Sequence, residues 1–542
     1  MPSYQLMRAD TGGIDNPLSV VIQDKPVTIG RHPENTIPIK DDMASRFHCV
    51  IEPDGAGGLR LRDLGSRNGT KVNGAKVLDK PLTAGDVIKI GSHEFAIQAE
   101  ATLKERQADA RSKAPATDPA WMIDLKELIG MLPPKGGLDD PLTIIDGRGK
   151  PTPVLEGITA GPMCFRLLLL AGSKSRATDI HCEPKGESFH VRMRVDGQMV
   201  SILDMPNSVG DLLYGVIKTA CQFPPASKET VLDGSLSSRL NGRRIDYRIS
   251  FTPSMHGQKL VCRILDQRDS PTRMSDLEMP PYMYERLRKI VEQDSGMLLV
   301  CGPTGSGKTT TLYNCLREID RSRRNVVTIE DPVEYYIEGV TQIPIDERKG
   351  NSFGSLLRSV LRQDPDVILV GEIRDEETAN TAMKAAMTGH LVFSTVHAKD
   401  TISTVFRLLD LKVEKTLMAS SLEVILAQRL LRILCDNCKR AVPVTPAQST
   451  RMGRYLENQK NIYVATGCSQ CLRTGYRGRK ALFELLDFSD DLRDVVLGDA
   501  NIQAMKKVIE AGLFTTLVQS GWQMVARGTT TLEEVDRVAT SR

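Results

Sequence analysis

Short runs of alternating apolar and polar residues fill the first hundred positions of the chain. Most are rich in β-branched residues, as in Val20–Ile22 and Val87–Ile90, and Gly, Asn and Asp separate them. A period of two residues with frequent turns is typical of half-buried antiparallel strands. We therefore predict an all-β sandwich over residues 1–100.

The pattern changes after this segment. Residues 101–160 are polar or rich in Pro and Gly, which predicts a linker, and within it Trp121–Leu132 has the spacing of a short amphipathic helix. Helical spacing within Gly161–Ala177, followed by strand patterns, predicts an α+β domain over residues 161–270.

Further along, the strand patterns become short, mainly apolar runs. Three such runs are Met297–Val300, Asn325–Ile329 and Val367–Val370. Continuous runs are typical of parallel strands that are buried on both faces. We predict an α/β core over residues 271–430, a cysteine-containing module over 431–485 and a helical segment over 486–542.

Composition limits the classes of function. A chain of 542 residues is too long for one hydrophobic core, so we expect about three or four domains. The net charge of +3 gives no reason to expect nucleic acid as an obligatory partner. We find no apolar stretch as long as a membrane span and no leader pattern after Met1, and most of the eleven cysteines are scattered. These features favour a reducing, cytoplasmic location.

One stretch carries the clearest chemistry of the predicted core. Gly302–Thr309, with sequence GPTGSGKT, fits the pattern G-x-x-x-x-G-K-[ST] between an apolar run and a helical pattern. Glycines let backbone N–H groups turn toward phosphate oxygens, and the start of a helix adds further donors. The motif predicts that ATP binds here, with Lys308 on the β and γ phosphates and Thr309 on Mg²⁺. A glycine-rich turn that only joins a strand to a helix is the alternative. The predicted nucleotide-binding residues are Gly302, Pro303, Thr304, Gly305, Ser306, Gly307, Lys308, Thr309 and Thr310.

Acidic residues follow two of the predicted parallel strands. Glu330 and Glu334 come after one strand, and Glu372 comes after another. Acids at the carboxyl ends of parallel strands face the nucleotide crevice, where they can hold Mg²⁺ or orient the attacking water. Buried acids also cap helices, so neither group is specific alone.

Four cysteines form two pairs with the same spacing. A spacer of 29 residues separates the pair Cys435 and Cys438 from the pair Cys468 and Cys471. Four thiolates in two such pairs predict a tetrahedral Zn²⁺ site with a structural role, because no coordination position is left open. Two redox pairs are the alternative, but neither pair lies in a βα context.

The first hundred residues resemble a forkhead-associated domain. Four phrases carry the resemblance: Gly30–Arg31, Ser45–His48, Gly65–Thr70 and Asn73–Gly74. It implies that the loops bind a phosphothreonine peptide, for which paired guanidinium donors are well suited. By this resemblance the pocket is lined by Arg31, Ser45, Arg46, Arg67 and Asn68. The alternative is a domain that keeps the fold but binds an unphosphorylated partner.

From about Ile180 to Val538 the chain resembles the secretion ATPase superfamily of type II secretion ATPases and type IV pilus motors. The phrases that carry the resemblance are Ala177–Pro184, Val191–Gly197, Asp246–Ser250, His256–Lys259, Thr388–His397, Ala427–Leu430 and Thr474–Arg479. The resemblance implies a RecA-like core and a homo-hexamer with each nucleotide between two domains. This chain departs from the family at Leu232–Ser235, where QDGR is common, and at Gln258, where a glutamate is common.

The same resemblance assigns roles to individual residues. It implies that Glu334 activates water, with Glu330 as its rival, and that Glu372 acts on Mg²⁺ or water. It also implies that Arg248 and Arg263 approach the γ-phosphate. The resemblance further implies that His390 and His397 couple the phosphate state to movement. Without the resemblance, the arginines would be a solvated or salt-bridged strand face and the histidines would be core residues.

Together these features favour one hypothesis. The chain would be a cytoplasmic ATPase, peripheral at the inner face of the inner membrane, that drives assembly of a type IV pilus or extrusion of a type II secretion pseudopilus. Its partners would be an inner-membrane platform protein and a phosphothreonine-bearing protein. The alternatives are a phospho-reading scaffold whose nucleotide switch turns over negligibly, and a DNA-uptake or conjugation motor, which the near-neutral charge does not favour.

Overall fold

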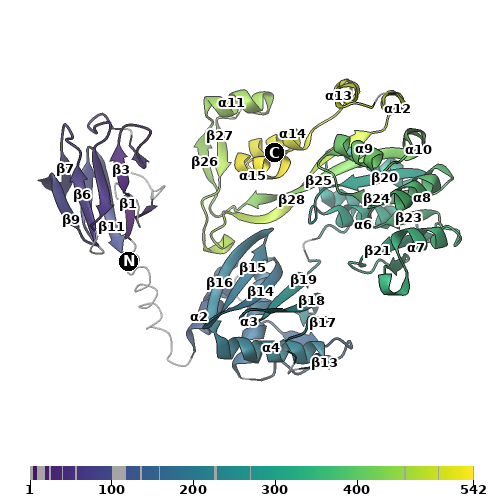
Figure 1. Cartoon of the computed structure of the whole chain (residues 1–542), viewed down its shortest axis with the longest axis horizontal. Helices are drawn as coiled ribbons and strands as arrows, with labels where there is room; N and C mark the ends of the chain where they lie inside the picture. The colour runs from purple at the N-terminus through teal and green to yellow at the C-terminus, as the bar shows by residue number, and fades with distance from the viewer. Residues whose placement is uncertain are drawn as a thin grey trace. The chain divides into compact units, whose positions relative to one another are not determined.

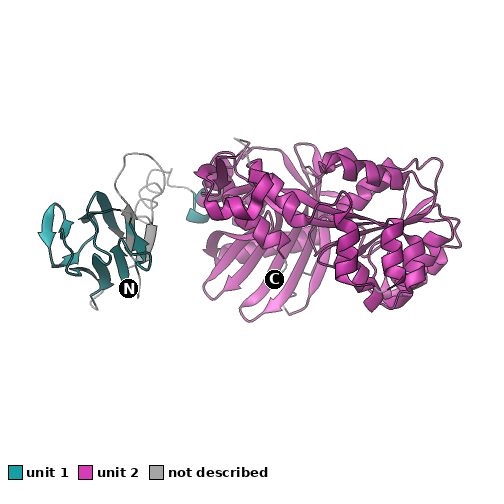
Figure 2. Ribbon diagram, turned by 90° about the horizontal axis from the view of Figure 1, so that it is seen from above, with its two compact units in different colours: residues 1–123 teal, residues 124–542 magenta. Residues whose placement is uncertain are grey.

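The computed structural model describes most of the chain. The described ranges are 4–8, 19–22, 26–39, 41–54, 58–99 and 118–540, with gaps in the last range at 135–136, 158, 225–226, 228, 269, 457–458 and 499. The chain divides into two compact units, residues 1–123 and 124–542 (Figure 2). Residues 101–117 of the predicted linker lie outside the described residues.

The first unit contains a sandwich of two β-sheets, which confirms the predicted all-β fold. One sheet has the strand order β2-β1-β11-β10-β7-β8 and the other has the order β4-β3-β5-β6-β9. Leu6, Ile29, Ile51 and Phe95 belong to the shared core because each is buried almost completely. The strands are β1 (Tyr4–Arg8), β2 (Ser19–Ile22), β3 (Val27–Gly30), β4 (Ile37–Pro38), β5 (Cys49–Pro53), β6 (Leu59–Asp63), β7 (Thr70–Val72), β8 (Ala75–Val77), β9 (Asp79–Leu82), β10 (Val87–Ile90) and β11 (His93–Ala99).

A helix and an eight-stranded antiparallel sheet follow. The sheet has the order β13-β12-β17-β18-β19-β14-β15-β16, and helices α3 and α4 pack on it and on each other. We call this sheet with its two helices the middle domain (Figure 1). Its elements, with the preceding helix, are α2 (Ala120–Met131), β12 (Leu142–Ile145), β13 (Pro151–Thr152), α3 (Ala160–Ser175), β14 (Ala177–Lys185), β15 (Ser188–Val195), β16 (Gln198–Pro206), α4 (Asn207–Cys221), β17 (Leu232–Leu240), β18 (Arg243–Ser254) and β19 (Gly257–Leu265).

The sheet of the middle domain begins earlier than its predicted start at residue 161. Strand β12 pairs with β17 through Ile144 and Ser238, and β13 pairs with β12. Both strands lie within the predicted linker. Strands of four and two residues among Pro and Gly are too short to give a periodic signal.

A seven-stranded sheet forms the α/β core that the sequence predicts. Its order is β22-β21-β23-β24-β20-β25-β28, with every neighbouring pair parallel except β25 and β28. We call it, with its helices, the core domain. Its elements are η1 (Met274–Leu277), α5 (Pro281–Val291), β20 (Gly296–Cys301), α6 (Lys308–Glu318), β21 (Val326–Glu330), β22 (Thr341–Pro344), η2 (Glu347–Lys349), α7 (Phe353–Val360), β23 (Val367–Val370), α8 (Glu376–Met387), β24 (Leu391–Val396), α9 (Thr401–Asp410), α10 (Lys415–Ser421), β25 (Leu422–Leu434) and β28 (Tyr476–Asp487).

The last part of the chain combines a small sheet with short helices. Strands β25 and β28 pair over most of their length, so the predicted boundary between residues 430 and 431 falls inside a continuous strand. The remaining elements are β26 (Arg440–Pro443), α11 (Pro446–Met452), η3 (Gly453–Leu456), β27 (Asn461–Val464), η4 (Ser469–Cys471), α12 (Asp490–Leu497), α13 (Ile502–Glu510), α14 (Leu517–Ala526) and α15 (Leu532–Ala539).

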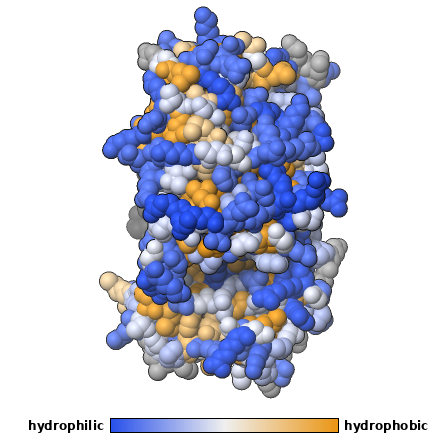
Figure 3. Space-filling model, turned by 90° about the vertical axis from the view of Figure 1, so that its right-hand side faces the viewer, coloured by the Kyte–Doolittle hydropathy of each residue, from blue (hydrophilic) through white to orange (hydrophobic). Residues whose placement is uncertain are grey.

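Within the described ranges, no helix combines the length and the apolar character that a membrane crossing requires. On the side of the molecule that Figure 3 shows, hydrophilic residues predominate and the hydrophobic ones form small separate groups.

Candidate functional site

The glycine-rich loop Gly302–Thr309 joins strand β20 to helix α6 at the carboxyl edge of the parallel sheet. Gly307 precedes the helix with a φ of +87°, a left-handed value that favours glycine. At Gly302 a β-carbon would lie 2.5 Å from the carbonyl oxygen of Gln428, so a side chain has no room. Gly302 therefore lets the loop lie close against β25, and Gly307 lets the backbone turn into the start of α6.

Lys308 bends back over the loop that precedes it. Its Nζ atom donates hydrogen bonds to the carbonyl oxygens of Gly302, at 2.9 Å, and Pro303, at 3.1 Å. Burial lowers the pKa of Lys308, and the nearby Glu372 carboxylate opposes this shift. Within the described structure, Ser306 Oγ is buried and has no hydrogen-bond partner. The loop thus holds a cation and an unsatisfied hydroxyl.

The two rival glutamates have different surroundings. Glu330 is only 4% exposed, and it accepts hydrogen bonds from Thr328 Oγ1 at 2.5 Å and from the Tyr313 hydroxyl. Glu334 retains 39% of its side-chain exposure, and its Oε2 lies 3.3 Å from Arg248 Nη2. Glu330 is therefore held within the core, whereas Glu334 lies at the contact between the core and middle domains.

Glu372 lies at the same edge of the sheet as the glycine-rich loop. His397 Nε2 is 3.5 Å from Glu372 Oε2, and Arg374 also pairs with this carboxylate. Glu372 is 13% exposed at its side chain, while His397 is 51% exposed. The structure thus brings two of the predicted residues, Glu372 and His397, into contact.

The structure does not bring every predicted residue to the loop. His390 precedes β24 and its carbonyl accepts a hydrogen bond from Gly296, the first residue of β20, so it lies at the amino edge of the sheet. A strand of this length places that edge on the order of 20 Å from the loop. Arg263 pairs with Asp179 inside the middle sheet, with Nε 3.1 Å from Oδ1.

Strand β25 contributes two residues whose role sequence reasoning missed. Thr311 Oγ1 donates to Gln428 Oε1 at 2.7 Å, and Arg429 Nη1 donates to the Gln428 carbonyl at 2.9 Å. Arg429 is 9% exposed, and burial lowers the pKa of its guanidinium. The polar pair inside the otherwise apolar stretch Val424–Leu431 was the available signal.

A cavity of about 450 Å³ lies beside the start of α6. Gly307, Thr310 and Gln428 line it from the core domain, and Thr178 and Arg268 line it from the middle domain and the segment after it. The space therefore continues from the glycine-rich loop into the boundary between two domains.

The four cysteines form one cluster. Their Sγ atoms lie within 4.8 Å of one another, with separations of 3.9 Å for Cys435–Cys468, 3.8 Å for Cys438–Cys471 and 3.7 Å for Cys468–Cys471. Tetrahedral coordination with Zn–S bonds of about 2.3 Å requires sulfur separations of about 3.8 Å, so the geometry fits Zn²⁺.

Hydrogen bonds to the sulfurs also suit thiolates. The Asn437 side-chain amide donates to Cys468 Sγ at 3.3 Å, and the backbone N–H groups of Cys468 and Gly475 donate to Cys471 Sγ. Burial opposes ionisation of Cys468, but the donors outweigh burial and lower the pKa to about 7. Burial raises the pKa of Cys435 to about 12. A metal ion would compensate for this cost of ionisation.

In the first unit, three loops that carry the predicted phosphopeptide residues lie together. The backbone N–H of Arg31 donates to the Ser45 carbonyl at 2.9 Å, and the N–H of Arg67 donates to Ser45 Oγ at 3.0 Å. Asn68 Nδ2 donates to the Met43 carbonyl at 2.7 Å. The side chains of Arg31, Arg46, Arg67 and Asn68 remain exposed at these loops.

His48 fixes the shape of the same loops. Its Nδ1 accepts a hydrogen bond from the Ser45 N–H at 3.0 Å, and the residue is fully buried. Burial lowers the pKa of His48, which favours the neutral ring that can accept this bond. A β-carbon on Gly30 would lie 2.5 Å from the Arg46 carbonyl, so glycine is required there.

The parallel sheet with a glycine-rich loop at its carboxyl edge defines an α/β core of the ATPase class. Residues 166–537 match the family described as Type II/IV secretion system protein. This match covers more than half of the chain, so the chain belongs to that family. Residues 27–91 match the FHA domain.

Individual relatives agree with this assignment. The Type II secretion system ATPase E of Vibrio cholerae is 38% identical over 402 residues, which cover 74% of this chain and 80% of that protein. The Type IV pilus assembly ATPase PilB of Myxococcus xanthus is 38% identical over 379 residues, covering 68% of this chain and 66% of that protein. The X-ray structure of the Legionella pneumophila ATPase DotB has a TM-score of 0.53 at 21% identity, covering 69% of this chain and 95% of that chain, and supports a common fold.

Proposed function

We propose that this protein is an ATP-hydrolysing motor that powers type IV pilus assembly or type II secretion. The observation that carries the proposal is the glycine-rich loop with Lys308 at the edge of a parallel sheet, with Glu372 close by. Membership of the Type II/IV secretion system family supports a motor that acts in secretion or pilus assembly. Relatives named for both machines are equally identical to this chain, so both machines stay within the proposal.

The proposed chemistry uses residues around the loop. Lys308 would exchange its two carbonyl partners for phosphate oxygens, and Thr309 would hold Mg²⁺, which neutralises charge on the phosphates. Glu334, rather than the enclosed Glu330, would orient the attacking water, because it is the more exposed of the two. Glu372 would act on Mg²⁺ or on water.

The remaining predicted residues fall into two groups. Arg248 already contacts Glu334, which supports a role for it where the γ-phosphate would lie. Arg263, His390 and His397 are proposed to act in coupling between domains or between copies of the chain. We infer a homo-hexamer at the cytoplasmic face of the inner membrane, acting through an inner-membrane platform protein.

The hydrolysis assay separates the motor from a scaffold with a nucleotide switch. Purified full-length protein should hydrolyse ATP with Mg²⁺, and Lys308→Ala should abolish this activity. Lys384→Ala is the matched control, because Lys384 is exposed on α8 and remote from the loop in the sequence. Equal rates for the wild type and Lys308→Ala would favour the scaffold.

The N-terminal domain is proposed to bind a phosphothreonine-bearing protein that regulates docking or activity. The exposed arginines at the joined loops support this proposal, because guanidinium donors pair with phosphate oxygens. A phosphothreonine peptide should bind more tightly than its unphosphorylated form, and Arg46→Ala should remove the difference. Arg60→Ala is the control, since Arg60 pairs with Asp79 on the strands at 2.6 Å. Equal binding of both peptides to the wild type would contradict the proposal.

A further inference from the structure

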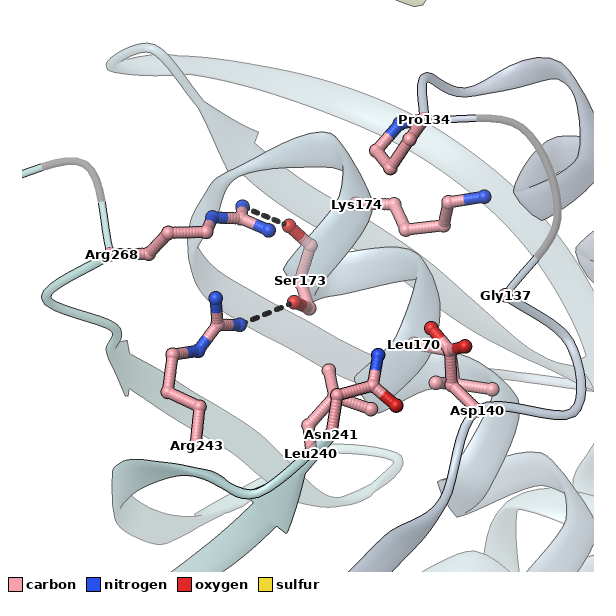
Figure 4. Close-up of a pocket in the computed structure, with 10 residues that line it drawn as sticks. All are labelled: Pro134, Gly137, Asp140, Leu170, Ser173, Lys174, Leu240, Asn241, Arg243 and Arg268. Carbon is pink, nitrogen blue, oxygen red and sulfur yellow. Dashed lines mark hydrogen bonds between the residues drawn. The ribbon is translucent and has the colours of Figure 1, made fainter.

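The middle domain contains a second cavity, of about 300 Å³. Figure 4 shows the residues around it, with Arg243 and Arg268 reaching toward Ser173 at the end of helix α3. Lys174 extends from the same helix end toward the segment that carries Pro134 and Gly137. The cations thus come from three separate parts of the chain: the end of α3, the start of β18 and the segment after β19.

Positive charge predominates in this cavity. Three cations line it together with one carboxylate, that of Asp140, while Asp266 contacts Arg243 at 3.1 Å without lining the cavity. Lys174 is only 8% exposed, so its charge is poorly solvated and interacts more strongly with an anion than it would in water. Among the described residues, Arg243 makes both of its hydrogen bonds through Nη2, to Ser173 Oγ at 3.3 Å and to Asp266 Oδ2 at 3.1 Å. Its other terminal nitrogen, Nη1, would be the donor to an anion in the cavity.

The lining also indicates the chemical class of the ligand. Guanidinium groups present paired donors whose spacing matches phosphate oxygens. Leu170 and Leu240 add apolar surface, and Asn241 adds an amide at the exposed rim. A volume near the lower end for small-molecule pockets leaves space for more than a bare ion. We propose that this cavity binds a small phosphate-bearing molecule, either inorganic phosphate or a sugar phosphate.

The cavity adjoins the one beside the glycine-rich loop. Ser173 and Arg268 line both cavities, and Arg268 Nη2 donates to the Ser173 carbonyl at 2.8 Å. A bound phosphate would draw the Arg268 guanidinium toward itself and remove positive charge from the wall that faces the nucleotide cavity. Phosphate and nucleotide should therefore weaken each other's binding by the same factor, since coupling between two sites is reciprocal.

Calorimetry on the full-length protein tests the proposal. The nucleotide site is first saturated with the Mg²⁺ complex of a non-hydrolysable ATP analogue, and inorganic phosphate or ribose 5-phosphate is then titrated. The variant Asn241→Asp adds a carboxylate at the rim, and aspartate tolerates the left-handed backbone at this position, where φ is +51°. We expect it to weaken phosphate binding about tenfold or more.

A matched pair of arginines supplies the control. Arg243→Gln should weaken phosphate binding to a similar degree. Arg244→Gln makes the same change at the next residue of β18, which contacts Asp246 at 2.9 Å and does not line the cavity, so binding should persist. Tighter binding of ribose 5-phosphate than of inorganic phosphate would identify a phosphate monoester as the ligand, and tighter binding of inorganic phosphate would identify the free ion.

Two results would overturn the proposal. One is the absence of binding at millimolar phosphate, and the other is equal weakening by Arg243→Gln and Arg244→Gln. The outcome does not depend on the motor function. If the ATP analogue itself fails to bind, sensitivity of phosphate binding to Asn241→Asp still reports on this cavity alone.

Discussion

At the scale of single residues, the structure separates two glutamates that the sequence leaves as rivals. Glu330 accepts hydrogen bonds from the Tyr313 and Thr328 hydroxyls inside the core, whereas Glu334 is partly exposed beside Arg248. We expect Glu334→Gln to lower kcat for ATP hydrolysis about a hundredfold or more with little change in nucleotide affinity, because only the orientation of water is lost.

The comparison with Glu330→Gln makes this prediction specific. Glu330→Gln should act mainly on stability, because the buried carboxylate is an acceptor for several donors and an amide cannot accept from all of them. Steady-state kinetics and thermal unfolding of both variants provide the check. A larger fall in kcat for Glu330→Gln than for Glu334→Gln would reverse the assignment.

At the scale of elements, helix α15 is tied to strand β25 by a buried ion pair. Glu534 is 1% exposed, and it accepts hydrogen bonds from Arg432 at 2.7 Å and from Arg537 at 2.6 Å. Burial alone would raise the pKa of Glu534, but the hydrogen bonds from Arg537 and Arg432 outweigh it and the pKa falls below 4.5. A lowered pKa means that the ionised form stabilises the fold above pH 4.5 and that this contribution is lost as pH falls through the folded-state pKa.

The variant Glu534→Gln tests this anchor. It should lower the free energy of unfolding by about 3–5 kcal/mol at neutral pH, because it leaves a buried arginine without its charge partner. The difference from the wild type should shrink as pH falls below 4.5 and through the lowered folded-state pKa of Glu534, because the carboxylate is then protonated. Glu533→Gln, an exposed neighbour, is the control for denaturant unfolding as a function of pH. A difference that does not change with pH would contradict the ionic explanation.

The cysteine cluster gives a second prediction at this scale. Its four sulfurs join the turn after β25 to the turn before β28, next to the small sheet of β26 and β27. We expect about one zinc ion per chain in the purified protein, and Cys468→Ser should reduce the zinc content to near zero. Ser469→Ala, in the same turn, should retain the metal. Zinc analysis by mass spectrometry checks both, and a metal-free wild type with an ordered module would refute the structural role.

The sequence was informative where a short stretch determines its own geometry. Gly302–Thr309 and the paired cysteines can be recognised from the spacing of their residues. In the structure, the first forms one loop between β20 and α6, and the four cysteine sulfurs form one cluster. Strands β12 and β13 escaped prediction because their pairing, of β12 with β17 and of β13 with β12, is set by tertiary contacts. The surroundings of Glu330 and His390 could not be inferred either, because they depend on side chains and strand edges far away in the chain.

At the scale of the whole molecule, one arginine links the middle domain to the core domain. Arg248 on β18 contacts Glu334 and also donates to the Val333 carbonyl at 3.1 Å, across 85 positions of the sequence. Arg263, on the neighbouring strand β19, pairs instead with Asp179 within its own sheet. The two arginines are register partners on adjacent strands, yet only Arg248 reaches the core domain in these contacts.

This difference predicts unequal effects of the same substitution. Arg248→Gln should reduce ATP hydrolysis about tenfold or more, because it removes positive charge next to Glu334 and loosens the contact between the domains. Arg263→Gln should reduce it less, since an exposed ion pair within one sheet contributes at most about 1 kcal/mol. Hydrolysis rates of both variants test this prediction. Their melting temperatures show whether a lower rate is caused by unfolding. Equal losses would mean that Arg263 also acts on the nucleotide, from a neighbouring copy of the chain or after domain movement.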